Sequence, residues 1–153
     1  MQLSLYRCNY QEIPEVIELL TALYIELGEE SDCVHFLTPE CVKEIMDSNT
    51  TEAYLIKDEN DKTLGIITLA ESNAFFAGGR YGLLDEMYIL PQFRSMNIGS
   101  SIMGQIKEIA KKRKWSRIDV TGPIDEKWSK TLAFYKKCGF EFTGPKLKMI
   151  ISH

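Results

Sequence analysis

The sequence predicts an α+β fold, or α/β with a mixed sheet, of about seven strands flanked by four helices. Two long stretches repeat apolar residues at helical spacing, and short apolar stretches of strand length lie between and around them. Because helices and strands occur in mixed order along the chain, neither an all-helical nor an all-strand class fits. The 153 residues contain no linker-like or repeated segment, so we predict a single domain over residues 1–153.

Four helices are predicted. The first begins at Ile13, where apolar residues start to recur every three or four positions, and it ends before Gly28. The second begins at Thr38-Pro39, because threonine favours the N-cap and proline the first helical position. The third covers residues 97–114 and has an apolar stripe and a basic end, and the fourth covers residues 127–137.

The predicted strands are short apolar or alternating stretches bounded by turn residues. Two of them flank the polar segment 57–62 and predict a hairpin. The last two follow the fourth helix. The seven strands are expected at residues 3–7, 53–56, 63–70, 81–90, 117–121, 140–142 and 146–151.

Composition and charge limit the classes of partner that are expected. The net charge of −4 and the pI near 5.3 disfavour nucleic acid, which is bound by basic surfaces, and suit an amine partner better. No apolar run approaches the roughly 20 residues of a membrane helix, and residues 1–7 have no apolar signal core. We therefore expect a cytoplasmic protein without nucleic-acid or membrane partners.

Cysteine and histidine usage gives no support for a metal site. None of the four cysteines forms a Cys-x-x-Cys pair, and His35 and His153 are the only histidines. We expect free thiols and no metal.

The most informative stretch runs from Tyr81 to Met103: a strand ends at Pro91, a short polar loop follows, and a helix begins near Gly99. The first turn of a helix has unpaired N–H groups and partial positive charge, which favour an anion such as a pyrophosphate. On the residues alone, anion binding stays one option, because many strand–loop–helix units bind nothing.

The segment Arg94-Ser95-Met96-Asn97-Ile98-Gly99 resembles the acetyl-CoA signature of the GNAT superfamily of N-acetyltransferases. Asn97 replaces the first glycine of that signature, and asparagine enters the left-handed backbone region more readily than most residues. The resemblance implies acetyl-CoA as cosubstrate. The residues it implies for coenzyme binding are Met87, Tyr88, Ile89, Arg94, Ser95, Met96, Asn97, Ile98, Gly99, Ser100, Ser101, Trp128 and Tyr135.

A second resemblance lies further along the chain. Phe134-Tyr135, followed by Gly139-Phe140, is similar to the Phe-Tyr-x-x-x-Gly-Phe segment that closes the coenzyme site in this superfamily. It implies that Tyr135 is the general acid that protonates the departing thiolate. Trp128 stands where the superfamily often has asparagine, so it either contacts the coenzyme or packs at the helix start.

The resemblance also implies that backbone near Met87 to Ile89 polarises the thioester carbonyl. Asp85 and Glu86 are the local candidates for the base. Regular strand alternation places Leu83, Asp85, Met87 and Ile89 on one face and Leu84, Glu86 and Tyr88 on the other, which favours Asp85. A bulge would exchange the two roles, and an acidic pair bound to Arg or Lys is the structural alternative. Acidic residues near the end of the first helix line an amine groove or form a solvated loop: Glu26, Glu29, Glu30 and Asp32, beside Tyr24.

The resemblance implies transfer of acetyl to a primary amine by direct attack in a ternary complex. We expect a small-molecule acceptor of the polyamine, amino-sugar or amino-acid type, and a monomer or homodimer. Three alternatives stay open: acetylation of a protein or peptide, acylation of a charged tRNA, for which the acidic chain offers only the basic cluster Lys111–Lys114, and a non-catalytic coenzyme A-binding sensor.

Overall fold

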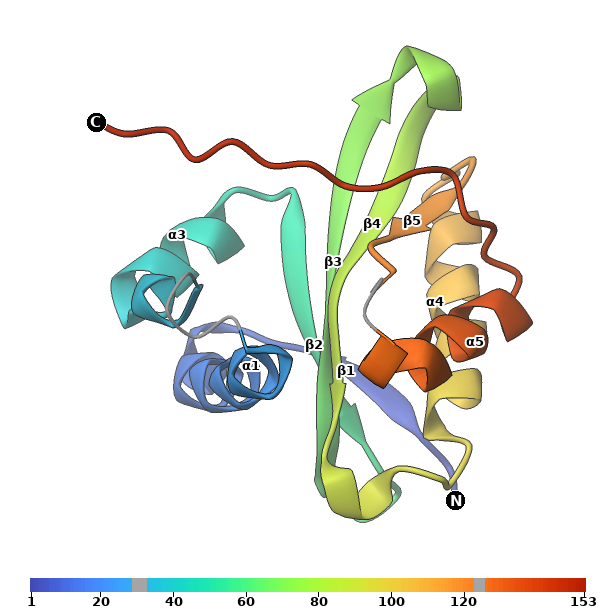
Figure 1. Cartoon of the computed structure of the whole chain (residues 1–153). Helices are drawn as coiled ribbons and strands as arrows, with labels where there is room; N and C mark the ends of the chain where they lie inside the picture. The colour runs from blue at the N-terminus through green and yellow to red at the C-terminus, as the bar shows by residue number, and fades with distance from the viewer. Residues whose placement is uncertain (29–32, 123–125) are drawn as a thin grey trace.

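A central β-sheet with helices on both faces forms the protein (Figure 1). In this computed structural model, the structure describes residues 1–28, 33–122 and 126–153. The predicted α+β class is confirmed. Among the described residues, no helix has the length and apolar character needed to cross a membrane.

Five strands make the sheet in the described part of the chain, in the order β1-β2-β3-β4-β5. The first four are antiparallel, whereas β5 runs parallel to β4. The strands are β1 (Ser4–Arg7), β2 (Thr51–Lys57), β3 (Thr63–Ala74), β4 (Gly79–Ile89) and β5 (Ile118–Val120).

The four predicted helices are confirmed, with boundaries within a few residues of those expected. They are α1 (Ile13–Leu27), α3 (Pro39–Asp47), α4 (Ile98–Lys112) and α5 (Ser129–Lys137). Gly28 ends α1 in the left-handed conformation, at φ 76°. The Thr38 hydroxyl accepts a hydrogen bond of 3.1 Å from the Cys41 N–H and caps α3.

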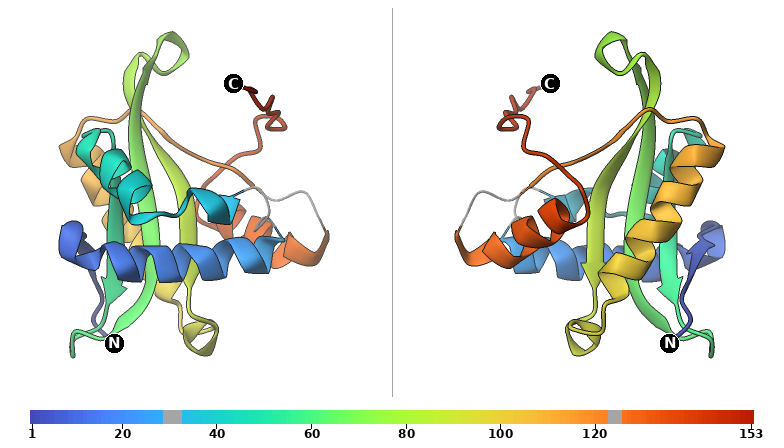
Figure 2. Two further views of the ribbon diagram at one scale, coloured as in Figure 1. Left: turned by 90° about the vertical axis from the view of Figure 1, so that its left-hand side faces the viewer. Right: turned by 90° about the vertical axis from the view of Figure 1, so that its right-hand side faces the viewer.

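The two faces of the sheet have separate cores. One core joins the sheet to α1 and α3, and its sheet residues include Leu55, Ile66 and Tyr88. The other joins the sheet to α4 and α5. Figure 2 shows α1 and α3 on one face and α4 and α5 on the opposite one. The sheet is therefore a wall between two compartments.

The last two predicted strands, at residues 140–142 and 146–151, are wrong. Residues after Phe140 have no regular secondary structure and extend away from α5 without joining the sheet (Figures 1 and 2). Their apolar side chains remain exposed, including Leu147 at 88% and Met149 at 83%. A pattern of alternating residues gives a strand only where a partner edge pairs with it, and here none does.

Candidate active site

A β-bulge at Asp85 is the centre of the site. Thr68 of β3 pairs with Glu86, whereas the next residue, Leu69, pairs with Leu84, so Asp85 is an extra residue in β4. The strict alternation expected for β4 therefore fails at this point. Leu84 packs in the α4/α5 core with Met87, and the bulged alternative is the one that the structure contains.

The bulge also reverses the direction of the backbone groups of β4. The Gly82 N–H points to β5, where it donates to the Arg117 carbonyl at 3.0 Å. The Leu90 N–H, also an even-numbered residue, instead points to β3 and donates to the Leu64 carbonyl at 2.9 Å. By alternation, the N–H groups of Met87 and Ile89 point away from β3.

These groups face an open edge. Strand β5 pairs with β4 only along residues 82–84, and in the described part of the chain no other strand pairs with that side of β4 beyond Leu84. Free N–H and C=O groups in an extended segment can pair with an extended chain that contains amides. Tyr88 lies differently, because its ring is in the α1/α3 core and its position pairs with Ile66.

The Glu86 side chain points to the α1/α3 compartment and is fixed by two hydroxyl groups. The Tyr24 hydroxyl of α1 donates to Glu86 Oε1 at 2.7 Å, and the Thr68 hydroxyl donates to Glu86 Oε2. Thr68 Oγ1 also accepts from the Glu86 N–H at 3.0 Å. Burial raises the pKa of Glu86, although these hydrogen bonds oppose the rise. Such a carboxylate is suited to accept a proton.

Sequence reasoning missed Thr68. Its only signal was a lone hydroxyl residue inside the apolar stretch from Leu64 to Leu69. Asp85 is more exposed than Glu86, and its partial burial raises its pKa.

Both carboxylates line a cavity of about 400 Å³ between α1, α3 and the sheet. Apolar side chains form most of the remaining wall, several of them from α1 and α3. Tyr24 of α1 contacts the carboxylate of Glu86 through the hydrogen bond of its hydroxyl. Of the acidic residues predicted near the end of α1, Glu29, Glu30 and Asp32 lie outside the described residues.

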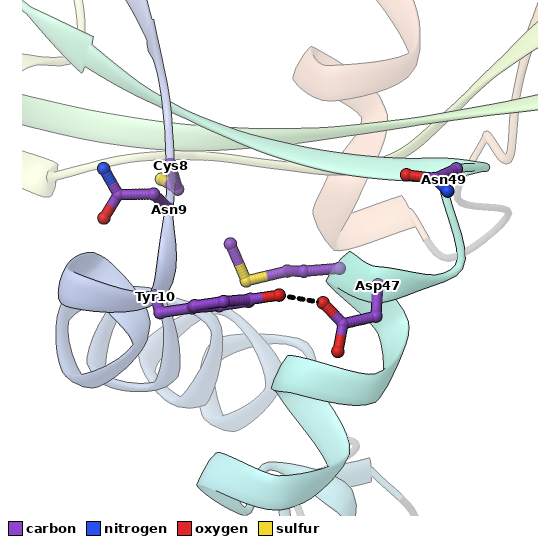
Figure 3. Close-up of a pocket in the computed structure, with 6 residues that line it drawn as sticks. Cys8, Asn9, Tyr10, Asp47 and Asn49 are labelled. Atoms are coloured by element: carbon purple, nitrogen blue, oxygen red, sulfur yellow. Dashed lines mark hydrogen bonds between the residues drawn. The ribbon is translucent and has the colours of Figure 1, made fainter.

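A larger cavity of about 490 Å³ lies elsewhere, between the start of α1 and the end of α3 (Figure 3). Two of its polar groups are paired with each other, since the Tyr10 hydroxyl donates to Asp47, which also binds Lys43. Burial raises the pKa of the Cys8 thiol in its wall to about 12, which makes this thiol a poor nucleophile. The cavity contacts neither β4 nor α4, so it is not the candidate site.

The loop before α4 has two residues in the left-handed backbone region. Asn97 adopts φ 58° and ψ 23°, as its replacement of a glycine leads one to expect. Ser95 is also left-handed, at φ 75°. No side chain caps the first turn of α4, so the N–H groups there are available to an anion. Met96, Ser100 and Ser101 are exposed around this turn, and Ile98 is buried beneath it.

Arg94 anchors this loop to α1. Its guanidinium forms a bidentate ion pair with Glu26, at 2.9 and 3.1 Å, and its Nε donates to the Ile89 carbonyl at 2.8 Å. The guanidinium also lies 5.4 Å from the centre of the Tyr88 ring. These contacts occupy Arg94 and give Glu26 a structural partner.

Tyr135 is placed by the packing of α5 on α4. Its neighbour Phe134 lies over Gly99, where an added Cβ would come within 2.7 Å of the ring. Only glycine leaves this space in the first turn of α4. Tyr135 itself is buried, at 9% exposure, in the same core as Met87 and Ile89. Burial raises the pKa of its hydroxyl to about 12, so the group stays protonated at neutral pH.

Trp128 precedes α5 at its N-cap position, half-buried, with the Lys127 ammonium 5.4 Å from its ring centre. Within the described residues, no cluster of His, Cys, Asp or Glu has an arrangement that could hold a metal ion.

The sequence matches the family model of the acetyltransferase (GNAT) family over residues 13–140. No curated protein sequence matches the chain. The fold is similar to that of an aminoglycoside acetyltransferase from an uncultured soil metagenomic sample, with a TM-score of 0.80 and 14% identity over 99% of this chain and 100% of that one.

Two further solved structures are similar. One is a soil metagenomic aminoglycoside acetyltransferase in complex with sisomicin, with a TM-score of 0.76 and 12% identity over 99% of this chain and 96% of that one. The other is a predicted acetyltransferase from Clostridium acetobutylicum with acetyl-CoA, with a TM-score of 0.75 and 19% identity over 97% and 96%. At these identities the likeness shows the fold alone. The family match covers most of the chain, and this chain therefore belongs to the GNAT family of acetyltransferases, which use acetyl-CoA, and is an N-acetyltransferase.

Proposed function

We propose that the protein transfers the acetyl group of acetyl-CoA to the primary amine of a small molecule, by direct attack in a ternary complex. The observation that carries this proposal is the bulge at Asp85, which turns Glu86 toward the α1/α3 compartment and the Met87 N–H toward the open edge of β4. An amine at the carboxylates and a thioester at the open edge of β4 would meet at this point of the strand.

The chain's own groups fit a coenzyme A molecule. The first turn of α4, entered through Asn97 and Ser95, would hold the pyrophosphate by its N–H groups. Backbone groups of Met87 and Ile89 would pair with the amide-containing arm. We assign Ser100, Ser101, Met96 and Trp128 to the rim of this site, whereas Arg94 would support it by holding the loop against Glu26.

Each step of the transfer has a residue suited to it. Glu86 takes a proton from the ammonium, because it is a buried carboxylate of raised pKa held in place by Tyr24 and Thr68. Asp85 adds negative charge that attracts the ammonium. The Met87 N–H polarises the carbonyl oxygen while the amine nitrogen attacks the carbonyl carbon. The C–S bond then breaks as Tyr135 donates its proton to the sulfur; the new amide nitrogen loses its extra proton to water, and Tyr135 regains a proton from water.

The sequence suggested acceptors of the polyamine, amino-sugar or amino-acid type. We propose that the protein works as a single domain, monomer or homodimer, without nucleic-acid or membrane partners. The acceptor would bind in the cavity at Glu86, so the residues that line this cavity would determine which amine is used.

Release of free thiol from acetyl-CoA in the presence of a panel of primary amines tests this function. Tyr135→Phe should lower kcat at least about tenfold, as expected for loss of a general acid. Tyr6→Phe, at a half-exposed position on β1, removes a hydroxyl far from the site and should leave kcat unchanged. Binding of acetyl-CoA without turnover of any amine would favour a coenzyme A-binding sensor, and absence of binding would contradict the cofactor assignment.

A further inference from the structure

We propose that the acceptor is a monoamine with an apolar aliphatic or aryl body, bound in the 400 Å³ cavity with its ammonium at Glu86 and Asp85. This inference rests on the proposed function and specifies its substrate class. It differs from the polyamine, amino-sugar and amino-acid types that the sequence suggested, because it follows from the wall of the cavity.

The charges of the cavity lie at one end. Glu86 and Asp85 are adjacent in β4, and Tyr24 and Thr68, which also line the cavity, are bound to Glu86. The carboxylates attract one ammonium group there. Away from this end, the wall contains no acidic side chain among the described residues that line it. A second ammonium held against this apolar part of the wall would lose hydration without gaining a partner among the described lining residues, which is costly.

Among the described residues that line the cavity there is no Lys, Arg or His. The cation that acts electrostatically on both Asp85 and Glu86 is Lys146, in the exposed segment after α5. The carboxylate of an amino acid would therefore lie beside two carboxylates that repel it, with one exposed cation nearby. This disfavours amino acids relative to amines of the same shape that lack the carboxylate.

The body of the cavity is apolar and partly exposed to water. Its wall includes Val16 and Leu20 of α1 and Val42 and Ile45 of α3. Phe36, in the short helix Val34–Phe36, and Ile45 line the cavity, yet they remain 60% and 45% exposed. Two large apolar side chains facing the same opening are a favourable surface for an apolar ligand, because its binding removes them from water. The volume is within the range typical of small-molecule sites.

Matched pairs of amines test the proposal. Phenethylamine and phenylalanine differ by the carboxylate, and hexylamine and 1,6-diaminohexane differ by the second ammonium. With saturating acetyl-CoA, we expect kcat/KM to be at least about tenfold higher for the first member of each pair, because an unpaired buried charge costs at least that factor. An amino sugar such as glucosamine should be a poor acceptor for lack of apolar surface.

A pair of variants tests the wall itself. Ile45→Ser replaces an exposed lining residue and should raise KM for hexylamine at least about threefold with kcat nearly unchanged, as expected for lost uniform binding. Ile25→Ser is the matched control: Ile25 is 58% exposed on α1 and does not line the cavity, so KM should not change.

The outcomes separate the two levels of the proposal. Turnover of glucosamine, 1,6-diaminohexane or phenylalanine at least as efficient as that of the apolar monoamines would overturn the inference and leave the acetyltransferase function intact. An equal effect of Ile45→Ser and Ile25→Ser would also overturn it. Turnover of no amine at all would overturn the proposed function, and the inference with it.

Discussion

Replacing Tyr24 by Phe tests whether Glu86 is the base. The change removes one hydroxyl from α1, 2.7 Å from Glu86 Oε1, and keeps the ring that packs there. The hydroxyl favours the ionised carboxylate, whereas burial favours the protonated one; Asp85 raises the pKa and Lys146 lowers it more weakly. Without the Tyr24 hydroxyl, Thr68 is the one of these two hydroxyl donors that still binds Glu86, and the pKa of Glu86 should rise further.

The size of the effect follows from the hydrogen bond that is lost. A hydrogen bond to a charged group contributes about 1.5–3 kcal/mol, and one pKa unit corresponds to about 1.4 kcal/mol. The acid limb of kcat/KM against pH should therefore move upward by about one to two pH units. Because a base must be ionised to act, the variant should lose activity on the acid limb and recover it at higher pH.

The assay is thiol release at low amine concentration and saturating acetyl-CoA across the pH range, with Tyr6→Phe as control. The amine's own titration is common to all three proteins and cancels in their ratio. An equal loss at every pH, with the acid limb unmoved, would refute the assignment of Glu86 as the titrating group. Tyr24 would then act only through packing.

Three further predictions concern stability. Glu86→Gln should unfold at a higher temperature than the unchanged protein at neutral pH. Burial raises the pKa of Glu86, so the stability of the unchanged protein falls as pH rises from the unfolded-state pKa of this group through its folded-state pKa, and the difference between the two proteins should narrow toward acidic pH. An equal difference at all pH values would argue against this. Gly82→Ala should lower the free energy of unfolding, measured in urea, by about 1–3 kcal/mol, because the added Cβ would lie 2.3 Å from the Trp115 ring. Gly104→Ala in α4, with open space around it, should raise that free energy by up to about 1 kcal/mol. Asn97→Gly should keep stability and acetyl-CoA affinity, whereas Asn97→Val should lose about 1–2 kcal/mol at its left-handed backbone, with calorimetry of acetyl-CoA as second readout.

The helices could be predicted because their signals are local. Gly28, Thr38 and Pro39 end or begin helices through their own backbone preferences, and the structure places them where the sequence did. The left-handed backbone at Asn97 was expected for the same reason. The two final strands failed, because strand formation depends on a partner edge that no local pattern reveals.

The bulge at Asp85 could be anticipated only as an alternative. Residues 83–89 read as a regular strand, and nothing in them fixes which residue is extra; the register against β3 decides it, since Thr68 binds the Glu86 N–H and carboxylate together. Thr68 and Tyr24 lie far from Glu86 in sequence, so their contacts depend on the assembled fold.

That one extra residue determines how the two compartments relate. In a regular β4, Glu86 and Leu84 would share a face, and the Leu90 N–H would point to the same side as that of Gly82. The bulge turns Leu84 toward the α4/α5 core and leaves Glu86 beside α1, while the backbone beyond it changes direction from β5 to β3. Strand β5 stops pairing at Leu84, just before the same point, so the free edge begins where the reversed backbone does. A carboxylate on one face and free N–H groups at the edge thus lie within a few residues of each other. Under the proposed function, an amine held at the carboxylate and a thioester held at the free edge would meet at this point of β4.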